Sequence, residues 1–80
     1  MNLTVLLFGI TTDIVGAASI QVELPEQSVI ADFKIELYKL YPKLKTLKSC
    51  AFAVNEAYAK DTTTLTKSDI IALIPPVSGG

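Results

Sequence analysis

The chain has 80 residues, of which 50% are hydrophobic and 19% charged, with one cysteine, no histidine and a formal net charge of −1. This length fits a single small domain, and the missing histidine excludes catalytic triads and histidine-containing metal sites. All seven basic residues are lysine and form no basic stripe, which argues against nucleic-acid binding.

Residues 5–10 form an apolar segment near the N-terminus, with no basic residue before it. A secretory signal needs a positive start, and a membrane span needs about 18 apolar residues. We therefore expect neither feature, and a cytoplasmic location.

Two strands are predicted in the first part of the chain. Residues 3–8 are almost continuously apolar, which is typical of a strand buried on both faces or of one that gives one face to a partner. Residues 19–24 alternate between apolar and polar, which predicts a strand with one wet face that ends at Pro25. The segment 11–16 between them is a short connector of at most one helical turn.

One helix is predicted over residues 28–41. Ser28 is a suitable N-cap, and Phe33 and Leu37 repeat at helical spacing. Pro42 ends the helix, because proline cannot continue the hydrogen-bond ladder. The apolar stripe must pack on a sheet, since no other predicted element could cover it.

The second half of the chain predicts residues 50–54 and 57–59 as a hairpin around Asn55-Glu56, and 70–74 as a last apolar strand. One helix among these strands predicts an α+β fold: the β-grasp, or ubiquitin-like, arrangement, in which a mixed sheet carries one main helix on one face. The most apolar strands, first and last, should be neighbours at its centre. The domain would span residues 1–76, with 77–80 as a tail.

The most informative feature is the end of the sequence, Pro75-Pro76-Val77-Ser78-Gly79-Gly80. A Gly-Gly end fits channels too narrow for a Cβ, and two prolines hold it away from the domain. We expect the Gly80 carboxylate to be the reactive group. A floppy end or a cloning scar is the alternative.

Other side chains offer little chemistry. Cys50 opens an apolar strand and is predicted to pack as a small hydrophobe, because no histidine or second cysteine could activate it. The spacing of Asp13, Asp61 and Asp69 is typical of turns. Three apolar residues could share the sheet face away from the helix and bind a partner, with core packing as the alternative: Phe8, Tyr58 and Ile74.

Four segments, residues 5–9, 13–16, 52–58 and 69–80, closely resemble the family of small, sulfur-carrier subunits of molybdopterin synthase. The ending Ile-Pro-Pro-Val-Ser-Gly-Gly is the most specific part. Thr12 stands where the family often has arginine, and Ser68 where it often has glycine. Ser68 would then adopt a left-handed conformation.

The resemblance implies a carrier that is not an enzyme on its own and binds no cofactor itself. An E1-like adenylating enzyme would use ATP to form an acyl-adenylate at Gly80, and a sulfur donor would convert it to a thiocarboxylate. Residues 75–79 would insert with Gly80 into the molybdopterin synthase large subunit, in a heterotetramer, to supply sulfur to cyclic pyranopterin monophosphate. The alternatives are a sulfur carrier for thiamine or tRNA thiolation, a ubiquitin-like modifier, and a plain interaction domain.

Overall fold

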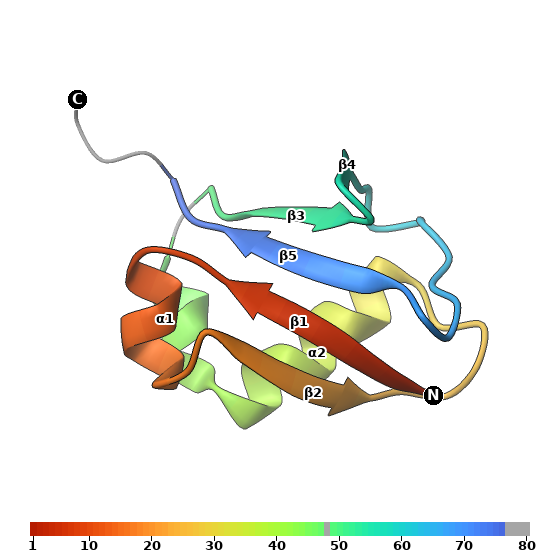
Figure 1. The fold of residues 1–80 in the computed structure, drawn as a ribbon, viewed down its shortest axis with the longest axis horizontal. Helices are drawn as coiled ribbons and strands as arrows, with labels where there is room; N and C mark the ends of the chain where they lie inside the picture. Colours follow the sequence, from red (N-terminus) through yellow and green to blue (C-terminus); the bar gives the residue numbers. More distant parts are fainter. Residues whose placement is uncertain (48, 77–80) are drawn as a thin grey trace.

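The computed structural model describes residues 1–47 and 49–76, which form a sheet with a helical layer behind it (Figure 1). The elements in chain order are β1 (Asn2–Leu7), α1 (Ile10–Val15), β2 (Ser19–Glu23), α2 (Ile30–Leu40), the 3-10 helix η1 (Pro42–Thr46), β3 (Ala51–Val54), β4 (Ala57–Tyr58) and β5 (Ile70–Ile74).

The sheet has the strand order β2-β1-β5-β3-β4. β1 and β5 pair in parallel, from Thr4 with Ile70 to Leu7 with Leu73, whereas the other neighbouring strands are antiparallel. The prediction that the first and last strands lie side by side at the centre is therefore confirmed. So is the α+β architecture, since α2 packs on one face only (Figure 1).

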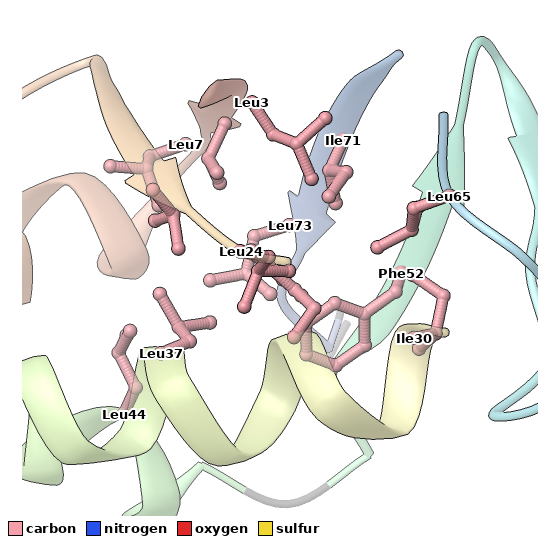
Figure 2. Close-up of a cluster of buried hydrophobic side chains, with 13 residues drawn as sticks. Leu3, Leu7, Leu24, Ile30, Leu37, Leu44, Phe52, Leu65, Ile71 and Leu73 are labelled. Carbon is pink, nitrogen blue, oxygen red and sulfur yellow. The ribbon is translucent and has the colours of Figure 1, made fainter. Parts of the chain in front are cut away.

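The core lies between the sheet and α2, where side chains from both layers point toward one another (Figure 2). Phe33 of α2 meets Phe52 of β3 edge to face, with ring centroids 5.9 Å apart. Alternate residues of the central strands complete this core, because successive side chains of a strand point to opposite faces. These residues are all buried: Leu3, Val5, Leu7, Ile71 and Leu73.

The start of α2 differs from the prediction. Ser28 does not cap the helix, because its hydroxyl donates a hydrogen bond to the carbonyl oxygen of Pro25, 2.7 Å away. Instead Val29 precedes the first helical residue, and its N–H donates to the Asp32 carboxylate at 2.9 Å. A carboxylate in the first turn also suits the positive end of the helix dipole.

The first connector is a helix, α1, rather than the predicted single turn at most. The buried Thr11 hydroxyl accepts a hydrogen bond from the Phe8 N–H and donates one to the Phe8 carbonyl oxygen, at 2.9 and 2.6 Å. This pair of bonds turns the chain after β1, which consequently ends at Leu7 rather than at residue 8.

Residues 77–80, the predicted tail, lie outside the described residues, so the division at residue 76 stays a prediction. Within residues 1–47 and 49–76, no helix combines the length and apolar character that crossing a membrane requires. The cytoplasmic location also stays a prediction.

Candidate functional site

The sheet face opposite α2 has no helix in front of it and points toward the viewer in Figure 1. Its apolar residues alternate with the core residues along the same strands. Phe8 is 48% exposed and Tyr58 is 78% exposed, so neither belongs to the core, and Ile74 is half-buried. We call this set the open-face patch: Leu6, Phe8, Tyr58, Ile70, Ala72 and Ile74.

The strand register shows how far the predicted partner residues share this face. Tyr58 pairs with Ala53, which pairs in turn with Ala72 of the central strand. Ile74 follows Ala72 by two positions and therefore projects to the same side. The structure thus brings Phe8, Tyr58 and Ile74 to one face, whereas their role in binding stays a prediction.

A hollow of about 460 Å³ lies in the open-face patch. Of the predicted partner residues, only Phe8 lines it. The other residues that line the hollow were not predicted from the sequence. The alternation that placed Leu7 and Leu73 on the core side nevertheless also places Leu6, Ile70 and Ala72 on this face. The residues lining the hollow are Leu6, Phe8, Asn55, Glu56, Ile70 and Ala72.

The β3–β4 turn at the rim of the hollow is held by hydrogen bonds from Asn55. Its backbone N–H donates to the Ile70 carbonyl oxygen, its side-chain oxygen accepts from the Ile70 N–H, and its amide group donates to Asp69, all at 2.8–2.9 Å. Asn55 and Glu56 both have positive φ, at 49° and 72°. The predicted tight turn at these two residues is confirmed.

Asp69 anchors the turn from the other side. Its carboxylate accepts from the backbone N–H of Thr66 at 2.8 Å and from the Asn55 amide. These bonds, the one from Thr66 foremost, favour the charged form and lower the pKa of Asp69. Ser68 beside it has a φ of 108°, the positive value expected from the sequence.

The described chain ends next to the open-face patch. β5 finishes at Ile74, Pro75 is half-buried and Pro76 is exposed. A Cβ on Gly9 would lie 3.3 Å from Cγ of Pro75, so the chain after β1 packs closely against the first residue of the segment 75–80 that is predicted to insert into a partner. The predicted site residues Val77, Ser78, Gly79 and Gly80 lie outside the described residues.

The remaining candidates carry no evident chemistry. Cys50 is half-buried, and this burial raises the pKa of its thiol against the opposing effect of Lys34, as expected for a packing residue. Asp61 and Asp69 lie in turns, but Asp13 does not, because it belongs to α1. Among the described residues, no three His, Cys, Asp or Glu side chains are grouped so that they could hold a metal ion.

Comparison with known proteins places the chain in a family. The ThiS family matches residues 5–80. The chain belongs to the ThiS family. A relative from Arabidopsis thaliana, a molybdopterin synthase sulfur carrier subunit, is 32% identical over 81 residues, which cover 100% of this chain and 84% of that protein. The resemblance to sulfur-carrier subunits predicted from the sequence is therefore confirmed.

Solved structures support the β-grasp fold of this ThiS family member. SAMP1 from Haloferax volcanii superposes with a TM-score of 0.90 over the whole of both chains, at 21% identity, which shows the fold alone. A complex of subunits 1 and 2 of the molybdopterin-converting factor from Helicobacter pylori contains a chain that is 25% identical, with a TM-score of 0.71 over the whole of both chains.

Proposed function

We propose that this protein is the sulfur carrier subunit of a molybdopterin synthase and that the α-carboxylate of Gly80 carries the sulfur. The main support for this proposal is the 32% identity to a sulfur carrier subunit over the whole chain, which includes the segment ending in Gly-Gly. The lack of histidine supports a carrier role, because the chain has few groups for acid–base catalysis of its own.

The chemistry proceeds in two steps on the Gly80 carboxyl. An E1-like adenylating enzyme joins the carboxylate to the AMP part of ATP and releases pyrophosphate. A hydrosulfide equivalent from a sulfur donor then attacks the carbonyl carbon and displaces AMP, which leaves a thiocarboxylate. The carrier binds no cofactor of its own in this scheme, because the adenylating enzyme binds the ATP.

The large subunit of molybdopterin synthase is the receiving partner. The open-face patch docks on it through Phe8, Tyr58 and Ile74, and residues 75–80 extend into its active site, where sulfur passes to cyclic pyranopterin monophosphate. The exposure of Phe8 and Tyr58 supports this contact, since apolar side chains form the centre of many interfaces. Two carriers and two large subunits make up the complete enzyme.

The test of the chemistry is an intact-mass measurement. The chain is incubated with the adenylating enzyme of the same organism, ATP and a sulfur donor. We expect its mass to rise by the difference between one sulfur and one oxygen atom, while a chain lacking Gly80 stays unchanged. An unmodified wild-type chain, beside an adenylating enzyme that modifies a known carrier, would count against the proposal.

The pathway is tested separately by genetic rescue. The gene should restore molybdenum cofactor synthesis in a strain that lacks its own carrier, and the version without Gly80 should not. Rescue of a thiamine or tRNA-thiolation defect alone would assign the carrier to another pathway. Stable conjugates to lysine side chains of other proteins would instead identify a modifier.

A further inference from the structure

In the part of the chain that the structure describes, Glu56 is the only charged residue that lines the hollow in the open-face patch. Its side chain is exposed, and it takes part in neither of the two ion pairs found within residues 1–47 and 49–76, which join Lys34 to Asp61 and Lys39 to Glu36. A partner group that fits an apolar hollow with one free carboxylate at its rim is an apolar side chain with a cation beside it.

The position of Glu56 is fixed by the structure rather than left to a mobile loop. Its φ of 72° is unfavourable for a residue other than glycine, so the surrounding contacts must hold the backbone there. Those contacts come from Asn55, whose three hydrogen bonds to Ile70 and Asp69 tie the turn to the start of β5. The turn thus places a carboxylate at one edge of the docking surface before any partner arrives.

The charge of Glu56 matters because docking would remove it from water. A carboxylate covered by an apolar surface without a partner strongly opposes binding, whereas a paired one gives specificity. A large subunit that covers the open-face patch must therefore either avoid Glu56 or neutralise it. Since Glu56 lines the same hollow as Phe8, avoidance would leave the hollow unfilled.

We infer that Glu56 is a specificity residue for the large subunit. This inference rests on the proposed function and deepens it. An apolar side chain of the large subunit enters the hollow between Leu6, Phe8 and Ile70. A lysine or arginine next to that side chain pairs with the Glu56 carboxylate.

The other half of the same sheet face supplies a matched control. There the side chains are polar, and the Gln21 amide donates a hydrogen bond to the Thr4 hydroxyl at 3.0 Å. Glu23 is an exposed carboxylate on this half, opposite Asn2 in the register and thus at the other end of β1 from Phe8. A charge reversal at Glu23 changes the net charge as much as one at Glu56, but outside the hollow.

The experiment measures the dissociation constant of the wild type, Glu56→Gln, Glu56→Lys and Glu23→Lys with the large subunit from the same organism. We expect about tenfold weaker binding for Glu56→Gln, about hundredfold or more for Glu56→Lys, and less than about threefold for Glu23→Lys. The affinity of Glu56→Gln should also fall less between low and high salt than that of the wild type, which a purely structural role would not produce.

Folding is checked separately through Glu56→Gly, which relieves the positive φ. We expect this variant to melt no earlier than the wild type and still to bind as weakly as Glu56→Gln. Wild-type affinity in Glu56→Lys would overturn the inference while leaving the proposed function intact. Failure of the wild-type chain itself to bind the large subunit would overturn both.

Discussion

The two faces of the sheet are built from the same strands and differ in almost everything else. On β5, Ile71 and Leu73 are buried under α2, while the alternate residues Ile70, Ala72 and Ile74 face outward and are only partly buried. The first set removes apolar surface from water when the chain folds. The surface of the second set that stays exposed can leave water only when a partner binds.

This contrast explains why β5 and the second half of β1, residues 5–7, are continuously apolar, although only one face of each strand lies in the core. A strand that serves folding alone alternates, as β2 does with its exposed Ser19, Gln21 and Glu23. A continuously apolar strand in a domain with helices on one face only indicates a second use for its other face. Truncating a core-facing residue of such a strand should therefore lower folding stability, whereas truncating its outward-facing neighbour should weaken partner binding.

The largest effect is expected from neighbouring truncations on β5. Leu73→Ala should lower the free energy of unfolding by about 2–5 kcal/mol, because it leaves a cavity in the core, whereas Ile74→Ala should cost less than half as much. Chemical denaturation of both variants measures this difference. Equal losses of stability in the two variants would mean that the outward face contributes to folding as much as the core face does.

The converse result is expected from the double variant Phe8→Ala/Tyr58→Ala. Both side chains are exposed, so stability should change by about 0.5 kcal/mol or less each. Affinity for the large subunit should fall by about 2–4 kcal/mol, since aromatic residues often carry the binding energy of an interface. Titration calorimetry checks the affinity, and unchanged binding would show that the open-face patch is not the docking surface.

Gly9 lies where the open-face patch meets Pro75, the residue after β5. Its φ of 54° and ψ of −132° suit glycine alone, and an added Cβ would press on Pro75. We expect Gly9→Ala to lower the free energy of unfolding by about 1–3 kcal/mol. Gly16→Ala is the control, because a Cβ there meets no atom within 4 Å and only the positive φ of 87° opposes it. A smaller loss at Gly9 than at Gly16 would contradict the close packing against Pro75.

Asp69 connects stability to pH at the edge of the hollow. Because hydrogen bonds lower its pKa in the folded state, its contribution is present above the unfolded pKa of about 3.9 and is lost as the pH falls through the folded value. Asp69→Asn should therefore be less stable than the wild type at neutral pH, and the difference should shrink below about pH 4. Denaturation curves at several pH values test this. A difference in stability between Asp69→Asn and the wild type that stays the same at every pH would refute this expectation.

The smallest effect is expected at the exposed ion pair on the helix side. Lys34 Nζ lies 2.7 Å from the Asp61 carboxylate, but both side chains are largely or partly in water. Asp61→Asn should cost about 0.2–1 kcal/mol, less at high salt. Lys34→Ala should cost more, because the lysine also covers the Phe52 ring, with Nζ 4.9 Å from its centroid. The reverse order in thermal unfolding would contradict this account.

The sequence predicted the sheet well because its strands carry strong local signals. Alternation in residues 19–24 and the almost continuously apolar segments 3–8 and 70–74 placed the strands and indicated which ones are central. The same logic placed Phe8, Tyr58 and Ile74 on one face. It did not extend to Leu6, Ile70 and Ala72, although the same alternation places them on that face.

The start of α2 was harder, since both Ser28 and Asp32 are suitable capping residues. A segment distant in the sequence decides which residue caps the helix. The Leu65 N–H donates to the Ser28 carbonyl oxygen at 2.8 Å, and the Ile30 N–H donates to the Thr63 carbonyl oxygen at 3.0 Å. These bonds hold the chain extended through Val29. Such tertiary pairing leaves no trace in the local sequence. The same is true of the hollow, which needs Asn55 and Ile70 to meet across the sheet.

The parallel ladder between β1 and β5 makes folding of the chain an all-or-none event. The partners at the heart of the sheet come from opposite ends of the chain, so a clipped molecule without its last strand would lose the core ladder and the docking surface together. Contacts between such distant segments also form late and slowly. A folded molecule therefore contains the strand that leads to Pro75 and Pro76, and a chain truncated before β5 should stay unfolded.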